Sequence, residues 1–202
     1  MNKLETLDDG RPRCWWGTGS DEYVAYHDHE WGRAVTDRSR LFEKLCLEGF
    51  QAGLSWLTIL RKRPAFREAF AKFDPETVAK FDESDVKRLL ADRSIVRHEG
   101  KIRSVINNAR RLPEFEDLVG ALSQWIWREY AEVGREAPIE IASITPASKD
   151  LSARLKKAGF SFVGPTTVYA FMQALGLVND HVGGCYVRDE CQTERMAVIN
   201  TL

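Results

Sequence analysis

The stretch from Leu45 to Leu60 constrains the fold most strongly, because Glu48 is its only ionised side chain. The stretch is too short to span a bilayer, which needs roughly 20 apolar residues, so we expect it to be buried in the core of the protein. A carboxylate buried alone in apolar surroundings is unfavourable by several kcal/mol and tends to take up a proton. Glu48 must therefore face solvent, pair with a cation of the protein, or meet a cation that a ligand brings.

Helical periodicity accounts for most of the chain from Arg40 onward, and it predicts an all-α fold of about eight to ten short helices. Residues 98–112 and 114–130 are predicted as two separate amphipathic helices. No clear run alternates with period two, as a half-buried strand would. The predicted helix caps are Asp74 ahead of Pro75, Ser84, and a Thr or Ser that opens the helix ending at Gly159.

The net charge of −1 excludes a basic field over the whole chain, so any binding of nucleic acid must depend on a local patch. The N-terminus is polar and acidic without a signal peptide, so we expect a cytoplasmic protein that does not associate with a membrane. Four cysteines in that compartment favour buried thiols or a metal over disulfides. Nothing in the sequence indicates an assembly larger than a monomer.

Two cysteines and two histidines, Cys14, His27, His181 and Cys185, form the first candidate site. His181 and Cys185 lie four residues apart in the motif H-V-G-G-C, a spacing that can present both side chains to one metal ion, whereas Cys14 and His27 are too far apart for a compact knuckle. Four such ligands would form a closed tetrahedral zinc site of the structural type. The alternative is unpaired thiols and ordinary histidines, and His29 competes with His27 as a ligand.

Aromatic residues crowd the N-terminal region and form the second candidate site. Between residues 15 and 31 the chain carries Trp15, Trp16, Tyr23, Tyr26 and Trp31. They indicate either a wall of the core or a stacking pocket for a flat ligand. If residues 47–56 form one helix, Glu48 and Trp56 project from nearby turns, and Gly49 and Gly53 allow another backbone or a ligand to come close.

Residues 155–167, with the sequence LKKAGFSFVGPTT, form the third candidate site. They predict a helix, a turn bounded by glycines and a second helix opened by Pro165, which is the form of a helix-hairpin-helix. Backbone N–H groups of the turn and the N-terminus of the second helix would bind a DNA phosphate. Arg154, Lys156 and Lys157 add positive charge nearby. The alternative is a plain corner between two helices.

Blocks of sequence between Arg13 and Cys185 resemble, in order, those of the 3-methyladenine DNA glycosylase I family. They are RCWW, YVAYHDHEWG, LFEKLCLEGFQAGLSW, FDPETVAKF, IVRHEGKIRSVINNAR and LKKAGFSFVGPTTVYAFMQALGLVNDHVGGC. The resemblance implies an all-α helix-hairpin-helix DNA glycosylase of base-excision repair, which acts on double-stranded DNA containing alkylated adenine. It places a glycosylase domain at residues 13–185, and leaves residues 1–12 as a loose leader and residues 186–202 as a tail without an assigned role. We further expect the N- and C-terminal segments to form one lobe around a middle helical lobe.

The resemblance also implies roles for individual residues. A structural zinc ion that joins the N- and C-terminal segments would be bound by Cys14, His27, His181 and Cys185. The base pocket would be formed by Glu48, Tyr26 and Trp56, with Trp16, Tyr23 and Trp31 nearby. The positions expected to meet the DNA backbone are Gly159, Gly164, Thr166, Lys156 and Lys157.

The chemistry of the lesion explains why such a pocket would contain a carboxylate. Methylation of adenine at N3 places a positive charge on the purine, which weakens the glycosidic bond. The base must leave the stack, which costs a few kcal/mol, before an aromatic slot can accept its flat face. We therefore expect Glu48 to select the cationic lesion by charge, to reject neutral adenine and to add modest catalysis to an already unstable bond.

Two further positions bear on the type of reaction. Relatives that also cut the DNA backbone carry a Lys two residues beyond the last glycine of the hairpin, for Schiff-base chemistry. This chain has Thr166 there, so we expect a monofunctional enzyme that leaves an abasic site. Many helix-hairpin-helix relatives use an Asp beyond the hairpin to help water attack. Asp180 is the nearest candidate, but it adjoins the predicted ligand His181, and the resemblance does not assign it that role.

Two other classes of function fit part of the pattern. A zinc-stabilised DNA-binding module without activity would keep the hairpin and the metal ligands, but it would not need Glu48 inside an apolar run. A helical protein that binds small cationic metabolites would use the aromatic residues without DNA, but Lys156 and Lys157 beside the hairpin argue against it. Release of free base from methylated duplex DNA distinguishes a glycosylase from both.

Overall fold

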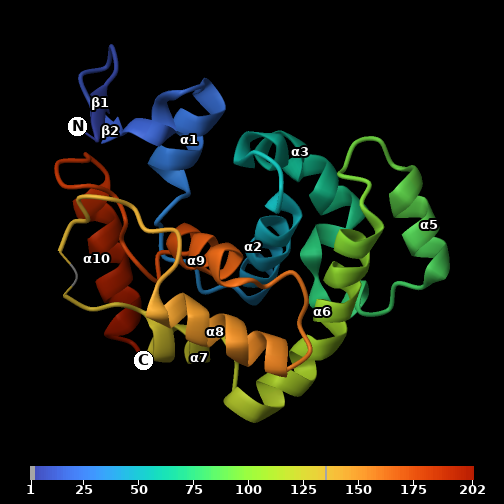
Figure 1. Cartoon of the computed structure of the whole chain (residues 1–202). Helices are drawn as coiled ribbons and strands as arrows, with labels where there is room; N and C mark the ends of the chain where they lie inside the picture. Colours follow the sequence, from blue (N-terminus) through green and yellow to red (C-terminus); the bar gives the residue numbers. More distant parts are fainter. Residues whose placement is uncertain (1–2, 135) are drawn as a thin grey trace.

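The computed structural model describes residues 3–134 and 136–202, and within them the chain is mostly helical (Figure 1). The α-helices are α1 (Asp21–His29), α2 (Arg38–Gln51), α3 (Trp56–Ala69), α4 (Pro75–Val78), α5 (Glu83–Ala91), α6 (Glu99–Val119), α7 (Leu122–Tyr130), α8 (Pro146–Lys157), α9 (Pro165–Ala174) and α10 (Arg188–Ile199). The remaining elements are two 3-10 helices, η1 (Trp15–Thr18) and η2 (Ala71–Phe73), and two strands, β1 (Leu4–Thr6) and β2 (Pro12–Cys14). The predicted helical class is confirmed, and the strands are an addition to it. None of the described helices combines the length and the hydropathy that a membrane span requires.

Helix α2 lies at the centre of the molecule and contacts α3, α6, α7 and α9. Every residue from Leu41 to Phe50 is buried, as expected for a helix that is covered on all sides. This buried stretch includes three charged residues, Glu43, Lys44 and Glu48. The core of the protein is therefore organised around a helix that carries charges into an apolar environment.

Most of the predicted caps are confirmed. The side chain of Asp74 accepts a hydrogen bond from the backbone N–H of Thr77 at the start of α4, with Pro75 in the first helical position. The helix cap before α8 is Thr145, and Gly159 follows the end of α8 with a φ of 85°. A residue with a side chain would be strained there, because positive φ values favour glycine.

Ser84 is not a cap, which corrects one prediction. Asp82 caps α5 instead, and its carboxylate accepts hydrogen bonds from the backbone N–H groups of Ser84 and Asp85. The side chain of Asp85 accepts in return from the backbone N–H of Asp82, at 3.2 Å. A carboxylate that reaches two free N–H groups in such a capping box satisfies the helix end better than a hydroxyl at Ser84 would.

Two helix boundaries also differ from prediction. Helix α6 continues through Pro113 and ends at Val119, before Gly120 with a φ of 85°, so the break does not fall near residue 113. Proline has no backbone N–H, so the helix lacks one hydrogen bond at Pro113. A helix of 21 residues nevertheless continues through this position. Residues 47–56 do not form one helix, because α2 ends at Gln51 and Ser55 caps the new helix α3.

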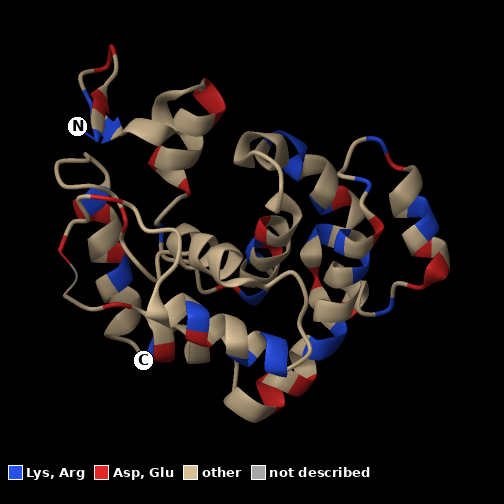
Figure 2. Ribbon diagram, viewed as in Figure 1, with Lys and Arg blue, Asp and Glu red and all other residues tan. Residues whose placement is uncertain are grey.

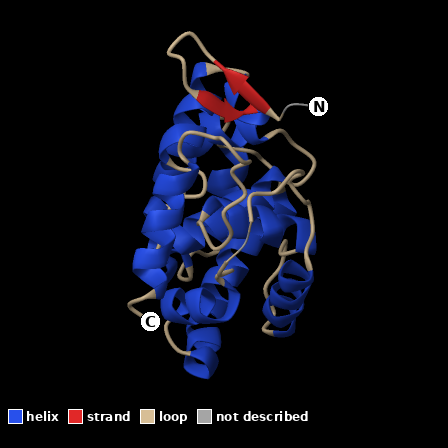
Figure 3. Cartoon of the chain, turned by 90° about the vertical axis from the view of Figure 1, so that its left-hand side faces the viewer, coloured by secondary structure: helices blue, strands red, loops and turns tan. Residues whose placement is uncertain are grey.

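The N- and C-terminal segments pack against each other, and the strand hairpin lies at one end of the helical body (Figures 1 and 3). Strands β1 and β2 pair antiparallel, with Leu4 opposite Cys14, and the backbone N–H of Tyr186 donates to the carbonyl of Pro12. The prediction of a loose leader is therefore wrong for residues 4–6, because strands of three residues are too short to show an alternating pattern. Residues 1 and 2 lie outside the described part of the chain.

The C-terminal segment, predicted as a tail, contains helix α10. The side chain of Arg195 on this helix is 1% exposed and donates to the backbone carbonyls of Glu132 at 2.6 Å, Leu177 at 2.8 Å and Gly176. These carbonyls belong to segments that follow α7 and α9. Arg195 thus fixes α10 to the helical body.

We expect Arg195→Ala to lower the free energy of unfolding by about 3 kcal/mol, because it removes a buried charge–dipole network and leaves several carbonyls without their donor. Chemical denaturation of the two proteins measures the difference. Thr193→Ala, at an exposed position of the same helix, is the control and should change stability by less than about 0.5 kcal/mol. Equal losses in both variants, or none in either, would show that Arg195 does not anchor the helix.

Candidate functional site

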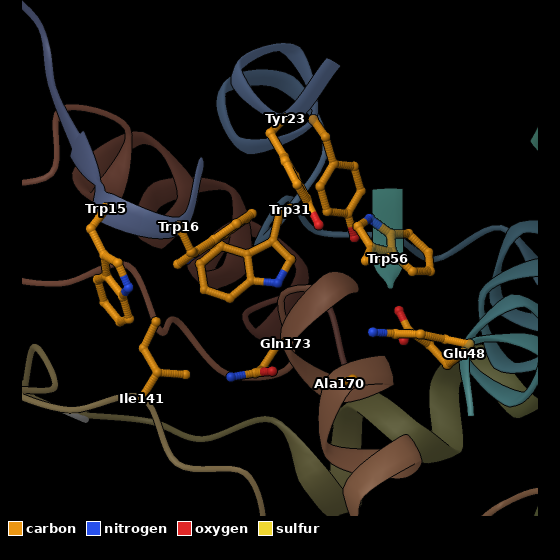
Figure 4. A pocket seen from close by; sticks show the side chains of 11 residues that line it. Trp15, Trp16, Tyr23, Trp31, Glu48, Trp56, Ile141, Ala170 and Gln173 are labelled. Carbon is orange, nitrogen blue, oxygen red and sulfur yellow. The ribbon is translucent and has the colours of Figure 1, made fainter. Parts of the chain in front are cut away.

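A cavity of about 420 Å³ lies between the N-terminal segment of the chain and helices α1, α2, α3 and α9 (Figure 4). Its lining residues are Trp15, Trp16, Tyr23, Tyr26, Trp31, Glu48, Gln51, Trp56, Ile141, Ala170 and Gln173. All six residues predicted for a base pocket are among them. The apolar stretch Leu45–Leu60 is divided between two helices, and the structure brings residues of both to the cavity. Glu48 lies near the end of α2, and Trp56 is the first residue of α3.

Five further lining residues were not predicted as site residues. Gln51 lies one helical turn after Glu48 on α2, so helical spacing was a signal that could have found it. Trp15 belongs to the aromatic run but was not singled out. Ile141, Ala170 and Gln173 come from distant segments and carry no local signal, because only the tertiary fold brings them to the cavity.

Aromatic rings brace one another around the cavity. The centroids of Trp16 and Trp31 lie 4.7 Å apart with an angle of 73° between the rings, and those of Tyr26 and Trp56 lie 5.3 Å apart. The indole N–H groups of Trp16 and Trp56 are buried and have no hydrogen-bond partner within residues 3–134 and 136–202. Buried polar groups are nearly always satisfied, so two free donors on a cavity wall favour a flat ligand that carries acceptors.

Glu48 reaches the cavity from α2 (Figure 4) and is 4% exposed. The nearest cation in the described part of the chain is Lys44, whose Nζ lies 3.9 Å from Oε1 of Glu48, one helical turn away. That separation is too long for a hydrogen bond. Lys44 Nζ instead donates to the hydroxyl of Tyr26 at 2.7 Å and lies 4.5 Å from the ring centroid of Trp56. Of the alternatives for Glu48, the structure therefore shows a cation of the protein nearby, which does not hydrogen-bond to the carboxylate and leaves its oxygens open to a ligand.

Burial shifts the titration of both partners. It raises the pKa of Glu48 to about 7, and the positive charge of Lys44 limits that rise. It also lowers the pKa of Lys44 to about 8, against the opposing effect of Glu48. Burial, with the charge of Glu48, likewise raises the pKa of Tyr26 well above its usual value. Burial thus disfavours the charged form of each of these three groups.

The four predicted ligands Cys14, His27, His181 and Cys185 form a buried group, which we call the Cys2His2 cluster. Cys185 Sγ lies 3.4 Å from His27 Nε2 and 3.5 Å from His181 Nδ1, and Cys14 Sγ lies 3.7 Å from His181 Nδ1. Tetrahedral zinc with its usual Zn–S and Zn–N bond lengths places sulfur and nitrogen ligands roughly 3.5 Å apart. The cluster is therefore compatible with a metal ion. His29 is exposed and outside it, so that alternative ligand is excluded.

Partners of the remaining ring nitrogens orient both histidines. His27 Nδ1 lies 2.8 Å from the carboxylate of Asp28, and His181 Nε2 lies 3.0 Å from the backbone carbonyl of Trp31. Burial opposes the ionisation of Asp28, but hydrogen bonds from the Arg13 guanidinium lower its pKa to about 2. Such outer partners fix the tautomer and orientation of metal-binding histidines.

The cluster also lies directly behind the cavity wall. The ring centroid of Trp16 is 5.4 Å from that of His27, and the ring centroid of Trp31 is 4.7 Å from that of His181. Both tryptophans line the cavity. The position of these two indoles therefore depends on how the two histidines are held.

Asp180 is buried and does not line the cavity. Its Oδ2 accepts hydrogen bonds from the hydroxyl of Tyr169 and from Nε2 of Gln173, each at 2.7 Å. Gln173 is a lining residue of the cavity. The structure thus places Asp180 behind Gln173, where it orients that amide.

The segment between α8 and α9 is held firmly by its neighbours. The side-chain amide of Asn108 donates to the carbonyl of Ser161 at 3.0 Å and accepts from the N–H of Ser161 at 2.9 Å, and Ser152 donates to the carbonyl of Val163. Gly164 precedes α9, whose first turn has no side-chain cap. The N–H groups at this helix start are therefore available to an anion.

Basic side chains lie next to this turn, on the end of α8 and on the adjoining part of α6 (Figure 2). Lys156 and Lys157 are exposed. Arg154 is engaged elsewhere, because its guanidinium lies 4.6 Å from the ring centroid of Trp125 and 3.2 Å from Glu129. A second cavity of about 230 Å³ extends from Glu48 to Thr166 and Thr167 at the start of α9.

Comparison with known proteins gives a consistent result. The sequence profile of the methyladenine glycosylase family matches residues 15–189. DNA-3-methyladenine glycosylase 1 of Escherichia coli (strain K12) is 49% identical over 177 residues, which cover 86% of this chain and 95% of that protein. A crystal structure of 3-methyladenine DNA glycosylase I is 47% identical, with a TM-score of 0.81 over 86% of this chain and 98% of that one. The corresponding enzyme of Staphylococcus aureus, whose structure addresses recognition of 3-methyladenine, is 37% identical, with a TM-score of 0.80 over 87% and 96% of the two chains.

The stability of the protein without ligand should report on the buried charge of Glu48. Because the folded-state pKa is raised to about 7, from about 4.5, the folded protein loses stability as the pH rises through that interval. Glu48→Gln lacks this ionisation, so its melting temperature relative to the wild type should increase between about pH 5 and pH 7.5. Thermal melting in matched buffers measures the difference. Gln51→Glu, which adds a carboxyl at another lining position, is the comparison, and its melting temperature should fall more steeply with rising pH than that of the wild type. A constant offset between wild type and Glu48→Gln would mean that the carboxylate is not ionised in a dry site.

Proposed function

The chain belongs to the methyladenine glycosylase family, and from this we infer that it excises 3-methyladenine from alkylated DNA. The reaction is hydrolysis of the N-glycosidic bond: water adds to the sugar carbon, and the base leaves with the electrons of the broken bond, which neutralise its positive ring. The observation that carries this function is the position of Glu48, a buried carboxylate whose oxygens accept no hydrogen bond from the described residues, in an aromatic cavity. Such excision starts base-excision repair.

The aromatic walls supply recognition of a flat base. Trp56 and Tyr26 stack on its faces, and Trp16, Tyr23 and Trp31 enclose it. A cavity of about 420 Å³ is in the usual range for a small-molecule site, and it admits a base only after the nucleotide has left the stack. The free indole N–H groups of Trp16 and Trp56 are suited to acceptor nitrogens of a purine.

Glu48 supplies the selection by charge. A base methylated at N3 is a cation in DNA, and a hydrogen bond to a charged group contributes about 1.5–3 kcal/mol, against roughly 1 kcal/mol for a neutral pair. Neutral adenine gains only the smaller amount and must still leave the stack. The bond to the cationic base is already weak, so the protein needs to add little catalysis once the base is bound.

The reaction ends with an abasic site. Thr166 occupies the position where relatives that cut the backbone carry a Schiff-base lysine, and its side chain offers no amine. Asp180 is held by Tyr169 and Gln173 away from the cavity, which does not favour a direct contact with the attacking water. Its role is to orient Gln173.

The turn between α8 and α9 binds the DNA backbone in a helix-hairpin-helix manner. Support comes from the uncapped N-terminus of α9, from the exposed Lys156 and Lys157, and from the second cavity that links Thr166 to Glu48. The backbone N–H groups at Gly164 and at the start of α9 fit a phosphate, which fixes the duplex beside the base pocket. The N–H of Gly159 already donates to the carbonyl of Lys156 at 2.9 Å, so Gly159 contributes the shape of the turn.

Zinc fits the Cys2His2 cluster by donor type, by separation and by burial. Bound zinc would have four protein ligands and no open position, so it would supply structural cross-linking. Cys14 and His27 come from the N-terminal segment, and His181 and Cys185 from the C-terminal segment, so the ion would join the two. Asp28 and the carbonyl of Trp31 would hold the two imidazoles in place.

The function is tested by incubating the protein with methylated duplex DNA and measuring release of free 3-methyladenine under single-turnover conditions. Trp56→Ala should retain its fold and weaken binding of the free base by ~10- to 100-fold, because base–aromatic stacking contributes roughly 1–3 kcal/mol. Trp127→Ala is the matched control for a tryptophan that belongs only to the core, and it should lose about 3–5 kcal/mol of stability.

Three outcomes of that test discriminate between the functions. Release of free base by the wild type supports the glycosylase, and DNA retention without release supports the inactive binding module. Neither retention nor release would favour a protein that binds small cationic molecules. A strongly destabilised Trp56→Ala variant that still binds base normally would contradict the stacking role.

We expect one zinc ion per chain, and Cys14→Ala or His181→Ala should lose the metal and melt at a lower temperature, because metal binding is coupled to folding. Elemental analysis of carefully purified protein measures the content. Cys46→Ala, which removes a buried thiol outside the cluster, should keep the metal. Metal-free wild-type protein with full activity and an unchanged melting temperature would overturn the assignment.

A further inference from the structure

Lys44 is a buried ammonium group that the proposed chemistry does not use. It lies on α2, is 6% exposed and is not a lining residue of the cavity. Lysine is rarely buried so fully unless it has a partner. Its position one helical turn before Glu48, within the fully buried part of α2, requires an explanation.

The contacts of Lys44 hold its ammonium group behind the carboxylate. Its Nζ donates to the hydroxyl of Tyr26 at 2.7 Å and lies 4.7 Å and 4.5 Å from the ring centroids of Tyr26 and Trp56. From there it is 3.9 Å from Oε1 of Glu48, close enough for a strong electrostatic attraction but too far for a hydrogen bond. The oxygens of Glu48 therefore stay open to the cavity.

The other charged groups around Lys44 are committed elsewhere. Directly after α1, Glu30 forms an ion pair with Arg63 of α3, with N–O distances of 2.5 and 2.6 Å. On α2 itself, Glu43 accepts a hydrogen bond from Arg67 at 2.8 Å, and Arg40 lies 3.7 Å from Glu43.

Glu48 has no second cation. Within residues 3–134 and 136–202, Lys44 is the only cation within 4.0 Å of its carboxylate. Lys44 and Glu48 are therefore each other's counter-ion.

We propose that Lys44 is a positioning residue that keeps Glu48 ionised in the dry pocket while leaving its oxygens free for a cationic base. The proposal rests on the function inferred above and names the group that makes charge selection possible at neutral pH. Without the ammonium group, burial alone would favour the protonated carboxyl, which no longer attracts a cation. At 3.9 Å and the effective dielectric of a protein interior, the attraction corresponds to at least about one pH unit in the ionisation of Glu48.

The test uses 3,9-dimethyladeninium, a base of fixed positive charge that has no glycosidic bond to break. Because this probe does not titrate over roughly pH 5–9, any pH dependence of its affinity belongs to the protein. The wild type should lose affinity as the pH falls through about 7, where Glu48 takes up a proton. In Lys44→Met, which keeps the length and apolar stem of the side chain, the midpoint should shift to higher pH by at least about one unit. The two affinities should converge at alkaline pH, where Glu48 is ionised in both proteins.

Lys87→Met is the control for the loss of one positive charge, since Lys87 is exposed on α5, and its profile should match the wild type. Affinity that is lower in Lys44→Met by the same factor at every pH would indicate a purely structural role and overturn the proposal. An unshifted midpoint would overturn it as well. Failure of the wild type to release base from methylated DNA would instead contradict the proposed function, so the two failures are distinguishable.

Discussion

The interaction on which the pocket depends is the pairing of two opposite charges inside a helix that is buried on all sides. Glu48 and Lys44 are one helical turn apart on α2, and the packing of α3, α6, α7 and α9 around this helix leaves them only 4% and 6% exposed. Attraction between charges is much stronger in such an environment than in water. The same burial makes an unpartnered carboxylate unstable, so the pair and the dry pocket are required together. In the proposed function, a cationic base meets a carboxylate that is ionised and accepts no hydrogen bond from the described residues.

The ends of the chain provide the opposite wall of the cavity. Trp16 packs on His27, and the backbone carbonyl of Trp31 contacts His181, so the Cys2His2 cluster lies immediately behind two indoles that line the cavity. A metal at the cluster would therefore fix the aromatic wall as well as the termini. The pocket has a central helix as its floor, and zinc at the cluster would cross-link the segments that carry the wall above it. Such preorganisation lowers the conformational cost of binding.

The sequence, read with the family resemblance, was sufficient to predict six residues that line the cavity, but not all of their partners. Aromatic crowding and an isolated charge are visible along the chain, but they left a wall of the core as an alternative, and the family resemblance assigned the six residues to a base pocket. Lys44 was missed because it precedes the apolar run by one residue, although a helical spacing of four links it directly to Glu48. Gln173 and Ile141 could not be predicted, since only tertiary packing brings them to the cavity. The strand Leu4–Thr6 was missed because three residues show no periodicity.

The central claim is that the pocket reads the charge of the base through Glu48. It is tested most directly by calorimetric titration of the wild-type protein at neutral pH with two ligands of the same shape. One is 3,9-dimethyladeninium, and the other is its uncharged isostere in which carbon replaces N3. The account predicts that the cation binds ~2- to 30-fold more tightly, because a hydrogen bond to a charged group contributes about 1.5–3 kcal/mol, against roughly 1 kcal/mol for a neutral pair. Equal affinities for the two ligands would show that the pocket recognises shape alone and would contradict the account.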